Sequence, residues 1–317
     1  MKQRTCVTCG GRVHTPKREG AVRELAVRLS RPATYPVIYR LLHSLSVCAS
    51  CLESLPFIGE EICRQCGRDM RAERYISEGR CRDCVREADE PLQGNRSLLR
   101  YDQDGKSMLS LFKYRGDERL AGYYGTLLAI AAFRFYTPSG FACIAAVPLH
   151  ARRLQERGFN QADLLAAYLG RATGIPVQTL LKRTKETEKL SKQWGRASRQ
   201  ESMREAFSWD ERAVLPGVAC VGSDRRGDDQ RNLTNPLGAG IGFLLGNWFR
   251  LRSAISHDSQ ATTVPPSNHR KPLPADPPKI LLIDDIYTTG STLRSCARTL
   301  QAHFGTIFKI YSLTIYR

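Results

Sequence analysis

The string from Ile280 to Leu293 constrains the fold of this chain most. Its first four residues, Ile-Leu-Leu-Ile, are a continuous apolar run of strand length, which is typical of a parallel strand covered on both faces. Two acidic residues, Asp284 and Asp285, follow directly, and small hydroxyl-bearing residues then lead into a helical pattern. A buried strand, a polar turn and a helix in this order predict an α/β domain with a parallel sheet.

The turn after this strand predicts a ligand site, because ligands of open α/β sheets bind at the carboxyl ends of the strands. Two adjacent carboxylates repel each other there, so Asp284 and Asp285 are expected to accept hydrogen bonds from paired hydroxyls such as those of ribose. For the same reason Asp285→Asn is expected to be no less stable than the wild type. The amides that open the helix would bind a 5-phosphate, and the residues expected to do so are Thr288, Thr289, Gly290, Ser291 and Thr292. The structural alternative, an Asp-rich turn with a threonine N-cap, needs only one Asp and one Thr.

Other segments supply the rest of the predicted sheet and its helices. Apolar runs predict strands at 97–101, 142–148 and 307–315, and helical spacing predicts helices at 120–135, 160–169 and 292–303. Gly174 and Pro176 are the stop signals of the helix that begins near Asn160. The alternation of strands and helices again favours a parallel sheet.

Cysteines dominate the first 90 residues. Eight of the eleven cysteines form Cys-x-x-Cys pairs, namely Cys6/Cys9, Cys48/Cys51, Cys63/Cys66 and Cys81/Cys84. Two such pairs complete a tetrahedral four-thiolate zinc site, whereas eight free surface thiols would be the alternative. The pairing order is open, and the long gap after Cys9 leaves room for a vacant first pair. Because this segment has few long apolar runs, we expect it to need zinc to hold it together.

The chain is strongly basic, with a formal net charge of +17. That charge favours anionic partners such as nucleic acid or phosphorylated metabolites, although a basic surface can also serve solubility alone. The longest apolar stretches, Leu127–Phe133 and Leu237–Gly246, are shorter than the ~20 residues that a membrane helix needs. With no secretory signal at the start, we expect a cytoplasmic protein without membrane insertion.

Composition divides the chain into parts. We expect a cysteine-rich zinc-binding domain at 1–90 and an α/β domain at 91–317, interrupted at 210–278. The interruption has a charged first part and a proline-rich end, so it is predicted to be a largely disordered insertion.

Six strings of the sequence resemble known families. Asp284 to Thr292 resembles the phosphoribosyl-pyrophosphate motif of type I phosphoribosyltransferases. The remaining strings resemble the competence protein ComF family, and the cysteine region resembles that family's zinc-binding head. Those strings are Leu99-Arg100-Tyr101, Phe112-Lys113-Tyr114-Arg115-Gly116-Asp117, Val147-Pro148-Leu149-His150, Arg153-Leu154 and Arg157-Gly158-Phe159-Asn160-Gln161-Ala162.

This resemblance implies a Rossmann-like phosphoribosyltransferase-type domain behind a small zinc-binding domain. It implies that phosphoribosyl pyrophosphate or a nucleotide binds with Mg²⁺, that Asp284 and Asp285 are the catalytic residues, and that the protein is linked to DNA uptake in natural transformation. Other competence proteins would then be partners. By resemblance Lys113 would contact the pyrophosphate. Arg152, Arg153 and Arg157 follow a strand end and are further candidates, unless they form a solvated helix start.

Three functions remain open at this point. The first is a Mg²⁺-dependent phosphoribosyltransferase, the second a non-catalytic binder of the same ligand or a nucleotide, and the third a single-stranded DNA-binding accessory protein. The basic stretch 182–204, with Trp194 as a stacking residue, would be a lid, a DNA contact or a solvated helix. No residue indicates a nucleobase acceptor.

Overall fold

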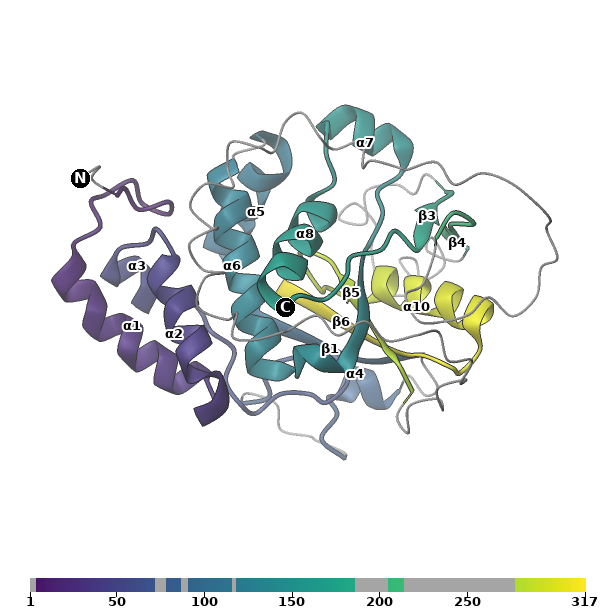
Figure 1. The fold of residues 1–317 in the computed structure, drawn as a ribbon, viewed down its shortest axis with the longest axis horizontal. Helices are drawn as coiled ribbons and strands as arrows, with labels where there is room; N and C mark the ends of the chain where they lie inside the picture. Colours follow the sequence, from purple (N-terminus) through teal and green to yellow (C-terminus); the bar gives the residue numbers. More distant parts are fainter. Residues whose placement is uncertain (1–3, 72–77, 87–90, 116–117, 186–204, 214–276) are drawn as a thin grey trace, which may run out of the picture. The chain divides into compact units, whose positions relative to one another are not determined.

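The computed structural model describes residues 4–71, 78–86, 91–115, 118–185, 205–213 and 277–317 (Figure 1). Met1–Gly217 and Pro274–Arg317 belong to one compact unit, and Val218–Leu273 to a second. The second unit lies wholly outside the described residues, as do residues 186–204 of the basic stretch 182–204. The predicted insertion at 210–278 and the domain boundary at residue 90 therefore stay predictions.

A parallel sheet of four strands forms the centre of the described structure. Its strands are β1 (Leu92–Leu99), β2 (Phe141–Ala146), β5 (Lys279–Ile283) and β6 (Lys309–Tyr316), in the order β1-β6-β5-β2. The central strand β5 pairs with β2 on one side and β6 on the other, and its last four residues are buried. The continuous apolar run at 280–283 is thus explained by burial on both faces.

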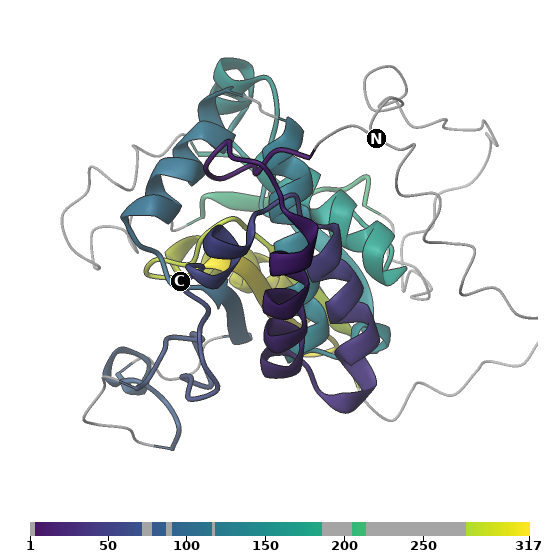
Figure 2. The same ribbon diagram turned by 90° about the vertical axis from the view of Figure 1, so that its left-hand side faces the viewer.

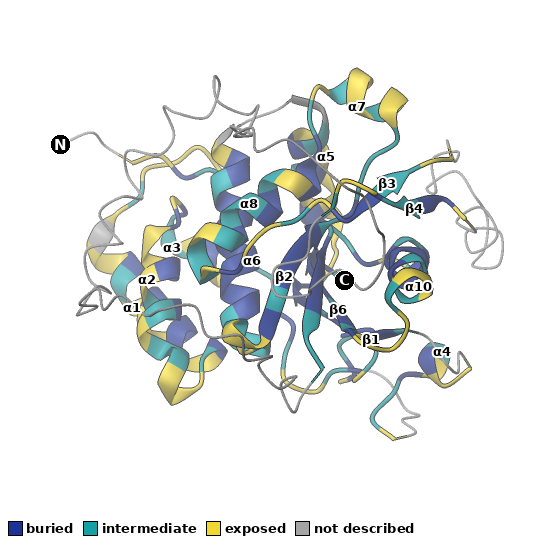
Figure 3. Cartoon of the chain, turned by 45° about the vertical axis from the view of Figure 1, so that its right-hand side comes forward, coloured by how far each residue is buried: buried dark blue, intermediate teal, exposed yellow. Residues whose placement is uncertain are grey.

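Helices cover both faces of this sheet (Figure 3). On one face α6 (Glu118–Phe135) packs against β1 and β6, and α8 (Gln161–Thr173) packs against β2. On the other face lies α10 (Ser291–Phe304), whose buried side includes Leu293, Ala297 and Leu300. The side chain of Asn160 caps α8 by accepting from the Ala162 amide, and Gly174 ends that helix in the left-handed conformation. The predicted α/β class with a parallel sheet is confirmed.

The N-terminal region contains a helical core that the sequence reasoning missed. There, α1 (Thr15–Leu29) and α2 (Tyr35–Ser44) lie side by side, joined by the short 3₁₀ helix η1 (Pro32–Thr34) (Figure 2). Val22, Leu25, Ala26 and Leu29 are buried; at this spacing they share one helix face without forming a long apolar run. Residues 15–44 therefore bury an apolar core that the composition of the region did not indicate, and the need of the region for zinc stays a prediction.

The remaining elements are one further helix, α5, and several short ones. They are α3 (Ala49–Glu53), α4 (Arg82–Val85), α5 (Gln103–Arg115), η2 (Pro138–Gly140), α7 (Ala151–Arg157) and the antiparallel pair β3 (Leu181–Arg183) and β4 (Phe207–Trp209). Strand β4 packs on α10, where Trp209 stacks on His303 with ring centroids 4.2 Å apart. Within the described residues, no helix is both long enough and apolar enough to cross a bilayer.

Candidate functional site

The turn between β5 and α10 is held firmly against the neighbouring strand β6. The amide of Asp284 donates to the carbonyl of Leu313 at 3.4 Å, and the carbonyl of Asp285 accepts from the amides of Ile315 and Tyr316 at 3.2 Å. Within the turn, Oδ1 of Asp284 accepts from the amide of Asp285 at 2.9 Å. The acidic pair is therefore fixed at the carboxyl edge of the sheet, where the sequence placed it.

The two carboxylates of this pair differ in their surroundings. Asp285 is 5 % exposed, and its Oδ2 forms an ion pair with Nζ of Lys113 at 2.5 Å. Burial, and then the nearby carboxylate of Asp285, raise the pKa of Asp284 to about 8. The strand end therefore holds one compensated carboxylate and one whose negative charge calls for a ligand or a cation.

Lys113 reaches the acidic pair from α5. Burial lowers the pKa of Lys113, but the charge and hydrogen bond of Asp285 outweigh burial, and the net pKa lies above its usual value. The carbonyl of Lys113 accepts from Nε2 of Gln161 at 3.2 Å, and Oε1 of the same Gln161 accepts from Nη1 of Arg157 at 3.1 Å. Gln161 thus links two of the predicted pyrophosphate residues, although it was not predicted as a site residue itself.

The other predicted arginines lie differently. Arg152 is exposed on α7 and pairs with Glu156 of the same helix at 3.4 Å. Arg153 is half-buried, and its charge contributes, after burial, to the lowered pKa of Arg183. Arg157, at the end of α7, is connected through Gln161 to Lys113 and so to the acidic pair.

The second half of the turn opens α10. Gly290 precedes the helix with a φ of +78°, which side-chain-bearing residues rarely adopt. Oγ1 of Thr289 and Oγ of Ser291 lie 2.7 Å apart. The first amides of a helix have no partner within it, so those of Ser291, Thr292 and Leu293 present a partial positive charge suited to an anion. Thr288 is exposed and Thr289 and Thr292 are half-buried.

Tyr287 supports this turn from below and was missed by the sequence reasoning. It is 2 % exposed, and a Cβ added at Gly290 would collide with its ring and hydroxyl. Its hydroxyl accepts from Nη2 of Arg294 at 3.3 Å, and the guanidinium of Arg317 lies 5.0 Å from its ring centroid. The sequence feature that could have identified Tyr287 is that it is the one aromatic residue in the turn.

The eight paired cysteines form two tetrads. One is Cys6, Cys9, Cys48 and Cys51, the other Cys63, Cys66, Cys81 and Cys84, with the four Sγ atoms of each within 4.8 Å of one another. A tetrahedral site with Zn–S bonds of about 2.3 Å separates its sulfurs by about 3.8 Å. The Cys9–Cys48 and Cys66–Cys81 pairs are 3.8 and 3.6 Å apart. Both tetrads therefore fit zinc, and the first pair is part of a complete set.

The two tetrads share a local architecture, which is a repeat that spacing alone did not show. In each, the first cysteine amide bonds a carbonyl five residues on, from Cys6 to Gly11 at 2.7 Å and from Cys63 to Arg68 at 2.8 Å. A left-handed glycine follows each first pair, Gly10 and Gly67. The second pair of each tetrad opens a short helix, α3 or α4. The backbone thus fixes the thiols in place.

The second tetrad belongs to the same hydrophobic core as the sheet. Its four cysteines are buried together with Leu92, Tyr287 and Leu293, and the amide of Asn95 in β1 donates to the carbonyl of Gln65 at 2.7 Å. In the first tetrad, by contrast, Cys9 is exposed. The second tetrad is therefore part of the core of the sheet, whereas the first tetrad is partly exposed.

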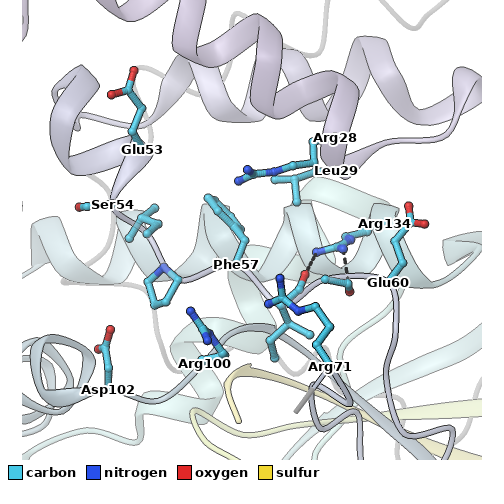
Figure 4. A pocket seen from close by; sticks show the side chains of 14 residues that line it. Arg28, Leu29, Glu53, Ser54, Phe57, Glu60, Arg71, Arg100, Asp102 and Arg134 are labelled. Carbon is cyan, nitrogen blue, oxygen red and sulfur yellow. Dashed lines mark hydrogen bonds between the residues drawn. The ribbon is translucent and has the colours of Figure 1, made fainter. Parts of the chain in front are cut away.

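A cavity of about 550 Å³ lies away from this turn, beside α1 and α6 (Figure 4). Its charged lining comprises Arg28, Arg71, Arg100, Arg134, Glu53, Glu60 and Asp102. Arg71 is held by Asp69, and Arg134 donates to the carbonyls of Ile58 and Gly59 at 2.7 and 3.0 Å. This balanced charge gives no preference for a phosphate, so the turn after β5 remains the candidate site.

The fold and these sites define a parallel α/β protein whose N-terminal region carries two four-cysteine sites with zinc-binding geometry. No protein-family model matches the chain. It is 33% identical over 172 residues to "Competence protein ComFC" of Bacillus subtilis (strain 168), covering 51% of this chain and 69% of that protein. It is 24% identical over 268 residues to "Competence protein ComFC" of Streptococcus pneumoniae (strain ATCC BAA-255 / R6), covering 84% and 86%. The chain belongs to the ComF family, which confirms the resemblance found in the sequence.

Proposed function

We propose that this protein binds phosphoribosyl pyrophosphate, or a related ribose 5-phosphate, at the turn from Asp284 to Thr292. The observation that supports this most is the acidic pair fixed at a strand end directly before a helix N-terminus. Asp284 and Asp285 accept the 2′ and 3′ hydroxyls, and the amides and hydroxyls from Thr288 to Thr292 bind the 5-phosphate.

The pyrophosphate arm lies on the side of Lys113 and Arg157. Lys113 already contacts Asp285, and Gln161 holds Arg157 close to Lys113. Mg²⁺ enters with the ligand, because it prefers phosphate oxygens and keeps several of its waters. A cation beside the acidic pair offsets the negative charge that burial makes unfavourable at Asp284.

Transfer to an acceptor is the second level of this proposal. A nucleophile of the acceptor would form a bond to ribose C1 while the bond between C1 and the pyrophosphate oxygen breaks, and the negative charge of the departing pyrophosphate needs cationic stabilisation. Lys113, Arg157 and the Mg²⁺ that accompanies the ligand supply it. Release of pyrophosphate in the presence of candidate acceptors separates a phosphoribosyltransferase from a protein that only binds.

The two relatives carry the name of competence proteins, which supports a role in DNA uptake, with other competence proteins as partners. A net charge of +17 also supports a second candidate function, binding of single-stranded DNA. Such binding should weaken steeply with salt because phosphate contacts release counterions. Replacing Lys189, Lys192 and Arg196, which lie outside the described residues, with Ala should make that slope shallower. No binding at low salt would remove this candidate.

A thermal-shift experiment with ligand fragments tests the site. Phosphoribosyl pyrophosphate with Mg²⁺ should raise the melting temperature most, since a ligand selective for the native state stabilises it. Ribose 5-phosphate alone should raise it less, and pyrophosphate with Mg²⁺ least. Equal shifts with pyrophosphate and with the whole ligand would show a non-specific basic patch instead of a ribose site.

A further inference from the structure

Arg317 lies between the second cysteine tetrad and the turn that opens α10. Its Nη2 donates to Sγ of Cys66 at 3.4 Å, and its Nη1 donates to the carbonyl of Thr288 at 2.9 Å. Nη1 also lies 3.5 Å from the carbonyl of Tyr287. One guanidinium thus contacts a metal-binding thiol and two peptide carbonyls of the turn.

The backbone of Arg317 is itself held in place. Its amide donates to the carbonyl of Leu99 at 2.9 Å, and its carbonyl accepts from the amide of Tyr101 at 3.0 Å. Leu99 is the last residue of β1 and Tyr101 follows it, so the backbone that carries the guanidinium is fixed to the sheet. A small cavity of about 150 Å³, lined also by Cys84, Thr289 and Arg294, lies beside it.

The chemistry of a four-thiolate zinc site explains why a cation is placed there. Four thiolates and one Zn²⁺ carry a net charge of about −2, and a hydrogen bond from outside the metal shell orients a ligand and tunes the site. The guanidinium has further N–H donors in fixed geometry. The group that donates to Sγ of Cys66 can therefore also donate to the carbonyl of Thr288.

The contacts of Arg317 with the turn also influence the amides at the start of α10. Arg317 lies over the ring of Tyr287, and that ring fills the space beneath Gly290. A shift of the guanidinium would therefore free both the peptide after Tyr287 and the ring under Gly290. These are the parts that set where the first amides of α10 point.

We propose that Arg317 is a positioning residue that couples metal occupancy of the second tetrad to the conformation of the turn at 287–291. The coupling rests on the proposed function only for the identity of the ligand that the turn binds. It predicts that each site stabilises the other, because coupling between two sites is reciprocal.

Hydrogen exchange of the zinc-loaded full chain tests the coupling without any ligand. Arg317→Met should raise the exchange of the amides at 286–292 roughly tenfold, the loss of about one charged hydrogen bond. Zinc release to a chromogenic chelator should accelerate in the same variant. Arg317→Lys keeps the charge but offers one compact head, so zinc release should stay near wild type while the turn still exchanges faster.

Arg68→Met is the matched control. Arg68 lines the same cavity as Arg317, and its guanidinium pairs with the carboxylate of Asp83 at 2.6 Å. The substitution therefore removes a cation near the second tetrad while leaving Arg317 in place. It should accelerate zinc release and leave exchange of the turn unchanged. Wild-type exchange at 286–292 in both Arg317 variants would overturn the proposal, as would equal effects of Arg68→Met and Arg317→Met on the turn.

Adding phosphoribosyl pyrophosphate with Mg²⁺ gives the reciprocal measurement. The ligand should slow zinc release in the wild type and have little effect on it in Arg317→Met. If the ligand binds to neither protein, the proposed function fails, while exchange and zinc release still decide whether Arg317 couples the two sites. If the ligand binds to both but changes zinc release in neither, the coupling fails and the proposed function stands.

Discussion

Nζ of Lys113 lies 2.5 Å from Oδ2 of Asp285, so one cation is committed to one member of the acidic pair. The carboxylate of Asp284, beside it, has a pKa raised to about 8 by burial and by Asp285. Asp284 and Asp285, which the sequence presents as equivalent, therefore have different roles in the unliganded protein. Asp285 forms the fixed partner of Lys113, and Asp284 carries the charge that a ligand or proton must offset.

This asymmetry predicts opposite effects of two similar substitutions. Asp285→Asn leaves the largely buried ammonium of Lys113 without its charged partner and should lower the free energy of unfolding by about 2 kcal/mol. Asp284→Asn removes an unfavourable buried charge and should not lower it. Urea unfolding at pH 8 measures both. The sequence argument, based on repulsion alone, expected no loss for Asp285→Asn, and equal stability of the two variants would favour that simpler account.

The raised pKa of Asp284 also predicts a dependence of stability on pH. The folded state keeps this proton up to pH about 8, whereas the unfolded chain loses it near the ordinary value of about 3.9. Its contribution to stability is therefore complete below the unfolded pKa and is lost as the pH rises through about 8. Unfolding free energies from pH 5 to 9 should show a decline in the wild type that Asp284→Asn lacks. Parallel profiles would contradict the shift.

Substitution of Gly290 tests how tightly the ring of Tyr287 packs beneath this glycine. Gly290→Ala meets both a left-handed φ of +78° and a collision with the ring of Tyr287. Gly174→Ala is the control, because Gly174 has a φ of +77° with nothing within 4 Å of an added Cβ. Backbone strain should cost about 1–2 kcal/mol in both, while Gly290→Ala should cost more and also weaken ligand binding. Equal costs would mean that the ring moves aside freely.

The two tetrads predict two zinc ions per chain with different roles. Cys9→Ser and Cys66→Ser should each reduce bound zinc by about one ion, since each removes a ligand from a four-thiolate site. Because the second tetrad shares the core of the sheet, Cys66→Ser should lower the melting temperature of the whole unit. Cys9→Ser should mainly expose residues 4–14 to protease. Metal analysis with limited proteolysis checks both, and zinc-free protein with an ordered second tetrad would refute the assignment.

Local sequence predicted the parts whose physics is local. The buried run at 280–283 and the acidic pair at its end follow from burial and charge within one stretch of chain. The strand predicted at 97–101 is longer than expected and starts at Leu92, because polar residues such as Asn95 and Ser97 are buried in a hydrogen-bond network with Ser312 and Thr314. Alternation rules do not anticipate a buried polar network.

Contacts between distant segments could not be predicted in this way. Which two Cys-x-x-Cys pairs form one tetrad depends on which of them the fold brings together. The Cys-x-x-Cys spacing is the same for all four pairs and therefore does not predict the partner. The contact of Arg317 with Cys66 joins residues that only the folded sheet brings together. Lys113 was predicted by resemblance and Arg157 by its place after a strand end. Gln161, which joins them, belongs to a string that carries the family resemblance but was not itself predicted as a site residue.

Calorimetric titration of wild type and Asp284→Asn with phosphoribosyl pyrophosphate and Mg²⁺ tests the central claim most directly. Asp284→Asn keeps the ion pair between Lys113 and Asp285, so a change in binding cannot be attributed to a damaged fold. At pH 9, above the pKa of about 8 of Asp284, this carboxylate is charged, and loss of a hydrogen bond to it should weaken binding roughly ten- to 150-fold. The unliganded melting temperature should be no lower than that of the wild type. Equal affinities, or no binding to the wild type, would contradict a ribose-phosphate site at this turn.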